Sequence, residues 1–438
     1  MKVLKFGGTS VGSTIMMKKV ARLISGNDDE LKIVVLSAMA GSTNKLVDIA
    51  EYLYTNNNDK AASLISELED HYYKVVDELF TEVDFKNDAS ELIKYHFDYI
   101  RSFTQDLFTV HEEKAVLAQG ELISSSLFQF YLEEQKINSV LLPALNFMRI
   151  DTNGEPDNYY IKENIKRELD LHPNSKLFIT QGYICRNLYG EIDNLKRGGS
   201  DYSASLIGAA IGAEEIQIWT DVSGLHFNDP RYVKGTKPIS KLSFDEAAEL
   251  AYFGAKILHP TSILPAKNAD IPVRLKNTLK PSDPGTLITS SVNGKGIKAI
   301  AAKDGITAIK IRSDRMLLAY GFLRKVFEVF ERYKTPIDMI TTSEVAVSVT
   351  IDDKSQLEKI IEELKVYGGV EVSENMAIIC LVGYNIIDQK GYIDEIFSAL
   401  RRVSIRMISF GGSRHNISVL ISADDKRKAL VSLNKIFS

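Results

Sequence analysis

The N-terminal residues that could do chemistry are those of Lys5-Phe6-Gly7-Gly8-Thr9-Ser10-Val11-Gly12, where a short apolar run ends in a glycine turn. Glycines let backbone N–H groups approach a phosphate closely, and the start of a following helix favours an anion. The lysine precedes the glycines, so this is not a P-loop. The segment predicts an anion site built by Lys5, Gly7, Gly8, Thr9 and Ser10. An ordinary glycine turn between a strand and a helix is the alternative.

Polar residues that could contact a ligand follow in two later segments. Ser37 and Thr43 come after the second apolar run, where capping of the next helix by Ser42 or Thr43 is the simpler interpretation. Glu121 stands at an expected helix start. Its carboxylate could cap the helix or could bind the ammonium of a substrate, and both interpretations stay open.

The segment Lys196-Arg197-Gly198-Gly199-Ser200-Asp201 offers the planar guanidinium of Arg197, which suits a carboxylate. Its two glycines leave room for a ligand. Ser200 or Asp201 could cap the small-residue helix that follows, because the helix dipole stabilises a carboxylate there. The functional alternative for Asp201 is to orient Lys5 and a ligand ammonium.

Two weaker segments lie further along the chain, around Trp219–Arg231 and Phe253–Pro260. They hold the polar residues Thr220, Asp221, His226, Arg231 and Lys256. The histidines and cysteines of the chain do not cluster with the spacing of metal ligands, so no metal site made by protein side chains is predicted.

Short apolar runs that alternate with helical patterns must position these segments. The expected strands are Val3–Phe6, Lys32–Ser37, Ser139–Leu142, Lys176–Thr180, Ile216–Thr220 and Pro272–Lys276. Runs that are apolar throughout, such as Ile33–Leu36, indicate strands buried on both faces of a parallel sheet. Lys60–Phe80 has the apolar spacing of a helix. The alternation predicts an α/β domain with ligands at the carboxyl ends of the strands.

The last third of the chain follows two turn-rich segments, Lys280–Thr286 and Val292–Gly296, and shows a weak internal repeat. Met339-Ile340 precedes Val347–Ile351, and roughly 70 residues later Met407-Ile408 precedes Ile417–Ile421. An amphipathic helix stands before each pair. Each unit reads strand–helix–strand–strand–helix, a small α+β module. A chance periodicity in a mixed chain is the alternative.

The composition of the 438-residue chain is that of a globular protein, with 45% hydrophobic and 25% charged residues. A net charge of −5 offers no field for nucleic acid. Two cysteines are too few for a disulfide framework. No apolar run approaches the length of a membrane helix, and the N-terminus lacks the features of a signal peptide. We therefore expect a cytoplasmic protein that begins near Met1.

Together, several motifs occur in the order found in aspartate kinases: K-F-G-G-T-S-V, S-A-M-A-G-S-T-N, G-E-L-I-S-S, R-G-G-S-D, W-T-D-V-S-G, D-P-R and F-G-A-K-I-L-H-P. The repeated tail resembles that family's pair of ACT regulatory modules. The resemblance implies an amino-acid-kinase fold over residues 1–290, a largely parallel sheet in an αβα sandwich. It also implies a regulatory region over 297–438, with modules at about 306–370 and 371–438 that could intertwine.

This resemblance implies that ATP, carrying Mg²⁺, phosphorylates the side-chain carboxylate of L-aspartate to 4-phospho-L-aspartate. That carboxylate has a free pKa of ~3.9, so no general base is needed, and catalysis must come from positioning and charge neutralisation. Lys5 and the Gly7–Ser10 amides would hold the phosphoryl group, with Asp201 orienting Lys5. Substrate would meet Arg197 through its α-carboxylate, Glu121 through its α-ammonium, and the hydroxyls of Ser37, Thr43 and Ser200. Nucleotide would meet Thr220, Asp221, Arg231 and Lys256, with His226 where the family often has Tyr near the adenine.

The tail resembles the effector module of lysine-sensitive aspartate kinases at Met316, Phe322, Leu323, Ile337 and Asp338. Asp338 would pair with the effector ammonium, while backbone groups near Phe322 and Leu323 would hold its carboxylate. Capping of a turn is the alternative role of Asp338. The resemblance implies feedback inhibition, with lysine as the expected effector, and a homodimer or homotetramer formed through the ACT modules. No nucleic-acid or membrane partner is expected.

Two other functions stay open at this point. Another amino-acid kinase, acting on glutamate, acetylglutamate or UMP, would share the fold, but T-S-E-V and F-G-A-K-I-L-H-P argue against it by resemblance. A catalytically silent amino-acid sensor would share the modules, but the presence of Lys5, Arg197 and Asp201 argues against it. A fused homoserine dehydrogenase is not expected, because the chain ends at Ser438.

Overall fold

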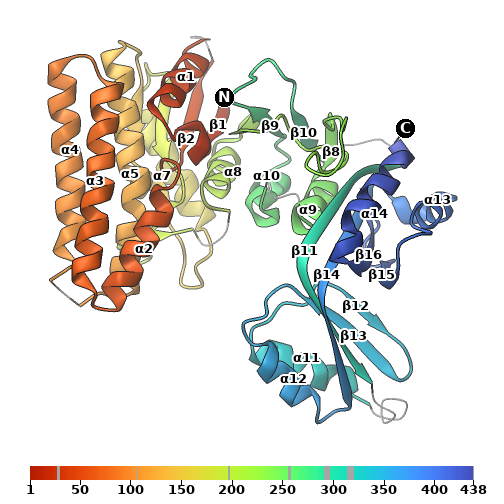
Figure 1. Cartoon of the computed structure of the whole chain (residues 1–438). Coiled ribbons are helices and arrows are strands. Elements are labelled where there is room, and N and C mark those ends of the chain that lie inside the picture. The colour runs from red at the N-terminus through yellow and green to blue at the C-terminus, as the bar shows by residue number, and fades with distance from the viewer. Residues whose placement is uncertain are drawn as a thin grey trace. The chain divides into compact units, whose positions relative to one another are not determined.

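The computed structural model describes residues 1–26, 30–105, 107–195, 198–254, 258–290, 296–312 and 320–437. By its internal contacts the chain forms two compact units (Figure 1). The first comprises Met1–Leu225, Ser240–Phe244 and Leu258–Ser290, and the second comprises His226–Ile239, Asp245–Ile257 and Ser291–Ser438. Within these described ranges, no helix is both long and apolar enough to cross a membrane.

An eight-stranded sheet forms the centre of the first unit, in the order β3-β4-β2-β1-β7-β9-β10-β8. Its strands are β1 Lys2–Phe6, β2 Lys32–Leu36, β3 Val140–Leu142, β4 Leu177–Gln181, β7 Glu215–Thr220, β8 Lys241–Ser243, β9 Val273–Asn277 and β10 Thr286–Thr289. Every neighbouring pair is parallel except β9 with β10. The six predicted strands and the largely parallel sheet are confirmed. A separate hairpin pairs β5 Ile184–Arg186 with β6 Ile192–Asn194.

The strand β10 was not predicted. It begins at Thr286, the last residue of the predicted turn-rich segment Lys280–Thr286, because the chain after Asn277 folds back and pairs antiparallel with β9. Pro284 and Gly285 lie just before the strand, where φ of Gly285 is +70°. The turn expected at Val292–Gly296 falls almost wholly outside the described residues.

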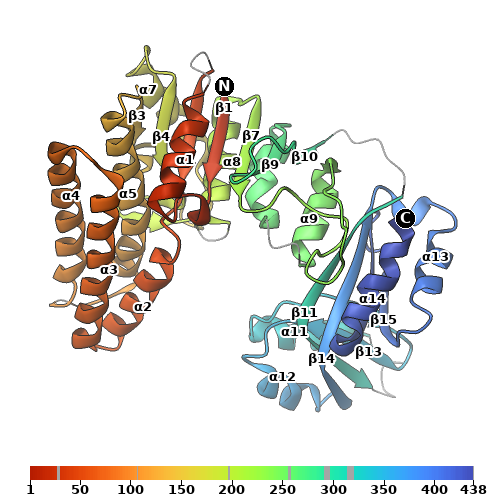
Figure 2. The ribbon, with the colours of Figure 1, turned by 45° about the horizontal axis from the view of Figure 1, so that its top comes forward.

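Helices cover this sheet, and three of the longest, α3, α4 and α5, lie side by side (Figure 2). The helices of the first unit are α1 Thr14–Ile24, α2 Ser42–Tyr54, α3 Asn58–Leu79, α4 Val83–Ser102, α5 Val110–Glu134, α6 Ala144–Phe147, α7 Asn158–Asp170, α8 Gly199–Ile211 and α10 Leu264–Asn268. The helix predicted at Lys60–Phe80 is confirmed as α3. Glu121, expected at a helix start, lies in the middle of α5, because a capping box of Thr109 and Glu112 starts that helix eleven residues earlier at Val110.

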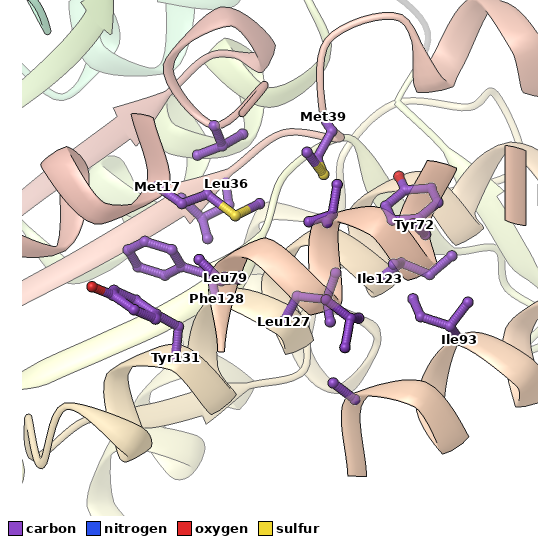
Figure 3. Close-up of a cluster of buried hydrophobic side chains, with 14 of the residues drawn as sticks. Met17, Leu36, Met39, Tyr72, Leu79, Ile93, Ile123, Leu127, Phe128 and Tyr131 are labelled. Carbon is purple, nitrogen blue, oxygen red and sulfur yellow. The ribbon is translucent and has the colours of Figure 1, made fainter. Parts of the chain in front are cut away.

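The main core of this unit joins the helices to one another and to the sheet (Figure 3). Met17 of α1, Leu36 of β2, Tyr72 of α3, Ile93 of α4 and Leu127 of α5 are all buried in it. Burial of each such side chain contributes about 1.5–3 kcal/mol. The Tyr72 hydroxyl also donates a 2.9 Å hydrogen bond to Ser42 Oγ at the start of α2. The core thereby supports the loop between β2 and α2.

Strand register brings the carboxyl ends of four strands to one level. Phe6 of β1 is paired with Leu36 of β2 and with Trp219 of β7, while Leu36 is paired with Gln181 of β4. The loops that follow these strands therefore meet at one edge of the sheet, where ligands bind in open α/β folds.

The second unit contains a six-stranded antiparallel sheet in the order β12-β13-β11-β14-β16-β15. Its strands are β11 Ile297–Arg312, β12 Ile340–Thr342, β13 Ala346–Ile351, β14 Gly369–Gly383, β15 Ile405–Phe410 and β16 Asn416–Ser422. Its helices are α11 Phe322–Arg332, α12 Leu357–Leu364, α13 Tyr392–Ala399 and α14 Lys426–Leu433, together with most of α9 Phe244–Tyr252. The order β-α-β-β-α occurs twice, so the predicted internal repeat of small α+β modules is confirmed.

The two long central strands, β11 and β14, contribute to both modules (Figures 1 and 2). Ile300, early in β11, packs in one hydrophobic cluster with residues of α13, α14 and β16. Ile309, late in the same strand, packs in the other cluster with residues of α11, α12 and β13. The register with β14 shifts between Lys303 and Ile306, where β11 passes from one module to the other.

Candidate active site

Lys5 and Asp201 form an ion pair at the carboxyl edge of the first sheet. Lys5 is the penultimate residue of β1, and its Nζ lies 2.6 Å from Oδ1 of Asp201 in the first turn of α8. Both side chains are largely but not fully buried, with 12% and 15% of their surface exposed. The dipole of α8 stabilises the Asp201 carboxylate, which holds the Lys5 ammonium at the sheet edge while a part of it stays accessible.

The glycine turn after β1 lies between two neighbouring loops. Gly7 N–H donates to the carbonyl of Trp219 at 3.3 Å, and the hydroxyls of Ser10 and Thr278 are 2.8 Å apart. A Cβ on Gly8 would lie 3.0 Å from the carbonyl oxygen of Ala38, so a side chain there would press on the loop after β2. Thr9 is exposed in the same 3₁₀ turn. Ser10 N–H donates to the Gly7 carbonyl at 2.8 Å, so the N–H groups that the turn offers to an anion beside Lys5 are those of Gly8 and Thr9.

Two consecutive glycines start α8 beside this turn. Gly198 and Gly199 have φ values of +80° and +45°, a conformation that other residues adopt at a cost. Gly198 is the N-cap, so the helix begins on a glycine and not on Ser200 or Asp201. Ser37 Oγ donates a 2.8 Å hydrogen bond to Ser200 Oγ, which joins the loop after β2 to α8. Arg197, the predicted carboxylate clamp, lies outside the described residues.

Glu121 projects from α5 toward the same loop and is only 4% exposed. Burial raises the pKa of its carboxyl to about 8, partly offset by a hydrogen bond from the Ala38 backbone and by the charge of Lys5. Its Oε2 is buried and has no hydrogen-bond partner within the described part of the chain. A buried acid with an open oxygen is a strong candidate for binding a cation such as an ammonium.

The approach of α5 to the loop after β2 depends on a small residue. A Cβ on Gly120 would lie 2.8 Å from Cβ of Ala38, and Ser124 Oγ donates to the Ser37 carbonyl at 2.7 Å. Thr43 lies in the first turn of α2, whose N-cap is Gly41. The structure thus brings Ser37, Ser200, Glu121 and the Lys5–Asp201 pair into one corner of the first unit.

Of the predicted nucleotide residues, Thr220 and Asp221 lie at this sheet edge. Thr220 ends β7, accepts a 2.8 Å hydrogen bond from Thr278 N–H through its carbonyl, and donates from Oγ1 to Asp221 at 3.1 Å. Two further residues at this edge were not predicted: Asn277, the last residue of β9, contacts Ser223, and Thr278, the next residue, contacts Ser10. The prediction of β9 was the available signal, because its carboxyl end lies at the same edge.

The other predicted nucleotide residues are not part of this group in the first unit. His226 and Arg231 belong to the second unit, where His226 Nδ1 lies 3.0 Å from Thr236 Oγ1 and Arg231 pairs with Asp229 at 2.6 Å. Lys256 lies outside the described residues. Among the residues that the structure describes, no group of three His, Cys, Asp or Glu side chains is arranged to hold a metal ion.

A largely parallel sheet with charged groups at its carboxyl edge is typical of open α/β folds that bind ligands at that edge. Residues 1–277 match the amino acid kinase family, and residues 379–437 match an ACT domain. The chain therefore belongs to the amino acid kinase family.

Its relatives are more specific. The lysine-sensitive aspartokinase 3 of Escherichia coli is 34% identical over 455 residues, covering 99% of this chain and 98% of that protein. The chloroplastic aspartokinase 2 of Arabidopsis thaliana is 33% identical over 99% of this chain and 84% of its own length. The crystal structure of E. coli aspartokinase III with aspartate and ADP matches the whole chain with a TM-score of 0.85 at 32% identity, as does the structure with lysine and aspartate. This similarity over the full length places the chain in the aspartokinase branch of the family.

Proposed function

We propose that this protein is an aspartate kinase that transfers the γ-phosphoryl group of ATP to the side-chain carboxylate of L-aspartate. The observation that carries the proposal is the buried Glu121 carboxylate, with its open Oε2, in the same corner as the Lys5–Asp201 pair. One group suits the ammonium of an amino acid and the other suits a phosphate. The aspartokinase relatives support aspartate as the substrate.

In the reaction, an oxygen of the aspartate side chain forms a bond to the γ-phosphorus while the bond to the β–γ bridging oxygen breaks. The products are 4-phospho-L-aspartate and ADP, and no proton is transferred, because the attacking carboxylate is already ionised. The barrier comes from bringing two anions together. Lys5 and, within the Gly7–Ser10 turn, the amides of Gly8 and Thr9 would neutralise the charge on the transferred group, with Asp201 positioning Lys5.

The substrate backbone would be held by charges of opposite sign. Arg197 would bind the α-carboxylate through its planar fork, and Glu121 would bind the α-ammonium. Ser37, Thr43 and Ser200 would line the pocket with hydroxyl groups. The bound ammonium would also lower the raised pKa of Glu121, so that binding and ionisation support each other.

For the nucleotide we propose Thr220, Asp221, His226, Arg231 and Lys256, together with the glycine turn. Mg²⁺ would arrive bound to ATP, since the cationic Lys5 and the N–H groups of the turn suit phosphate oxygens and not a metal. When bound, the ion would neutralise part of the phosphate charge.

For regulation we propose residues 1–290 as the catalytic domain and 297–438 as the regulatory region, with modules at about 306–370 and 371–438. Lysine is the proposed effector, and Asp338, Phe322, Leu323, Ile337 and Met316 are its proposed contacts. In support, α11 begins at Phe322 with the glycine N-cap Gly321, so its first N–H groups suit a carboxylate. Met316 lies outside the described residues. A cytoplasmic location and a homodimer or homotetramer stay predictions.

The test is a hydroxamate assay, which traps acyl phosphates, with ATP, Mg²⁺ and a panel of amino acids. We expect product with L-aspartate and at least tenfold less with glutamate or acetylglutamate. Preference for another acceptor would indicate a different amino-acid kinase. No product with any acceptor, despite binding of an amino acid, would indicate a catalytically silent sensor.

A further inference from the structure

Helix α9 contacts the six-stranded sheet of the second unit and the chain around it through residues on one of its faces. Glu246, Glu249 and Tyr252 are three residues apart, so they lie along one face of the helix. Glu246 is fully buried and pairs with Lys298 of β11 at 2.9 Å. Glu249 accepts a hydrogen bond from Asn416 of β16, and Tyr252 donates to Asp338 at 3.3 Å. Tyr252 therefore contacts Asp338, the side chain proposed to bind the ammonium of the effector.

Asp338 is already ion-paired with a lysine side chain of the protein, Lys303. Nζ of Lys303 lies 2.6 Å from Oδ1 of Asp338 and 2.8 Å from Oδ2 of Asp352, and it stands 4.9 Å from the centre of the Tyr252 ring. The Asp338 side chain is 2% exposed, that of Lys303 19% and that of Asp352 39%. An ammonium of the protein thus occupies the carboxylate at which an effector ammonium is proposed to bind.

The cluster carries an excess of negative charge. It contains the two carboxylates of Asp338 and Asp352 and the one ammonium of Lys303. Oδ2 of Asp338 is buried and has no hydrogen-bond partner in the described ranges. Burial raises the pKa of the Asp338 carboxyl despite the nearby lysine. A buried carboxylate with an unpaired oxygen is stabilised by a cation with several N–H donors, and an amino-acid ammonium supplies both the charge and the donors.

The carboxylate is held in place, whereas the lysine has an alternative partner. Asp338 N–H donates to the Thr350 carbonyl at 2.9 Å, and Met339 N–H donates to Thr350 Oγ1 at 2.9 Å. These bonds fix Asp338 against β13. Lys303 lies at the register shift of β11 and can keep the more exposed Asp352 if it loses Asp338. Movement of Lys303 is therefore the easier response to a new ammonium.

We propose that Lys303 competes with the effector ammonium for Asp338, and that Tyr252 transmits the exchange to α9. This inference rests on the proposed regulation by lysine. It adds the residue of the protein that competes with the effector, Lys303, and the residue that passes the change on to α9, Tyr252. When the effector takes Asp338, Tyr252 loses its acceptor and the cation beside its ring. From Tyr252 the chain continues through Lys256, a proposed nucleotide residue, and enters the first unit at Leu258.

The first experiment compares two substitutions of Lys303 that should act in opposite directions. Lys303→Met removes the competitor, so we expect the Kd of lysine, measured by calorimetry at pH 8, to fall about tenfold. Lys303→Arg keeps the charge and offers a bidentate fork to Asp338, so we expect the Kd to rise about threefold or more. Lys310, on the same strand and 3.8 Å from Glu371, is the matched control for both changes. Its Met and Arg variants should leave the Kd unchanged within twofold.

The second experiment separates binding from transmission. Tyr252→Phe keeps the ring and removes the hydroxyl, so we expect the Kd of lysine to stay within about twofold while maximal inhibition falls. Tyr333→Phe, which removes a 2.6 Å hydrogen bond to Glu363 in the same module, is the control and should keep full inhibition. Inhibition is expressed relative to the rate of each variant without lysine.

The outcomes distinguish this inference from the proposed function. Wild-type protein that makes aspartyl hydroxamate and binds lysine supports the proposed function. If Lys303→Met and Lys303→Arg then shift the Kd in the same direction, or not at all, the competition is overturned. If Tyr252→Phe keeps full inhibition, the route through α9 is overturned. Wild-type protein that binds no lysine would overturn both the regulation and this inference.

Discussion

Each of the two units contains a lysine paired with an aspartate at 2.6 Å, and the two pairs differ in which partner is the more buried. In the Lys5–Asp201 pair both side chains are similarly exposed, and the aspartate lies at the start of a helix whose dipole stabilises it. In the Lys303–Asp338 pair the aspartate is almost completely buried, and the lysine is shared with Asp352.

The difference indicates which group is available to a ligand. The dipole of α8 adds to the stabilisation of Asp201 by Lys5, so we expect the lysine of the first pair to be the group that turns its charge to an incoming phosphate. Asp338 is buried with its Oδ2 unpaired in the described residues, so we expect the carboxylate of the second pair to be the group that binds a ligand. The same type of ion pair, Lys with Asp, thus suits an anionic ligand in the first unit and a cationic ligand in the second.

The largest expected effect is that of removing the lysine of the first pair. Lys5→Ala should lower kcat by ~10²–10⁴, the range found when a positioned charge is removed from a transition state. Lys2→Ala, on the same strand and paired with Glu30, is the control for folding and should keep kcat within about twofold. If the folded Lys5→Ala protein kept the kcat of the wild type, Lys5 would not be the group that neutralises the phosphoryl charge.

In the second pair, removal of the carboxylate should have the larger effect on the ligand. Asp338→Ala should weaken inhibition by lysine about 10²-fold, because an ammonium loses its buried charged partner. Titrations with lysine, threonine and methionine separately measure this. Asp353→Ala, in an exposed turn nearby, is the control. Unchanged lysine inhibition in Asp338→Ala would keep the effector and reject the site, whereas inhibition by threonine alone would reject lysine.

Glu121 is the buried carboxylate of the first unit that corresponds to Asp338 of the second, because each has an oxygen with no hydrogen-bond partner in the described residues. Its pKa is raised to about 8 by burial, so kcat/KM for aspartate should fall as the pH is lowered through about 8. Glu121→Gln should remove this dependence and raise the KM for aspartate ~10-fold or more. Glu113→Gln, at the start of the same helix, should retain the wild-type profile.

The same raised pKa predicts a change in stability with the opposite sign. The folded state binds a proton at Glu121 that the unfolded state releases above its ordinary pKa of 4.5, so ionisation costs stability as the pH rises from there toward about 8. The Tm of Glu121→Gln relative to the wild type should therefore increase between pH 5 and pH 8. A Tm difference that is independent of pH would contradict the raised pKa.

The smallest expected effect is that of a change which keeps the charge. Arg197→Lys should raise the KM for aspartate about tenfold with a smaller change in the KM for ATP, because lysine lacks the planar fork. Initial-rate measurements with each substrate varied in turn would test this. The reverse pattern would move Arg197 to the nucleotide side.

Local sequence patterns were sufficient for six strands of the first sheet and for the helix α3. The predicted strands were confirmed because runs such as Ile33–Leu36 are apolar throughout, and α3 was confirmed because its apolar residues recur at helical spacing. The strand β10 was missed because its formation depends on pairing with β9 and not on its own residues. Glu121 was placed at a helix start because the buried α5 shows almost no difference between its faces that would reveal how far it extends.

The sequence by itself determined the α/β and α+β parts, their order, and the set of charged and glycine-rich segments that could bind ligands. These depend on residue types and on spacing within short windows. Only the tertiary structure decided that Lys5 pairs with Asp201, that Glu121 is buried with an open oxygen, and that Lys303 occupies Asp338. Each of these depends on strand register and burial between residues far apart in the chain, which no local pattern records.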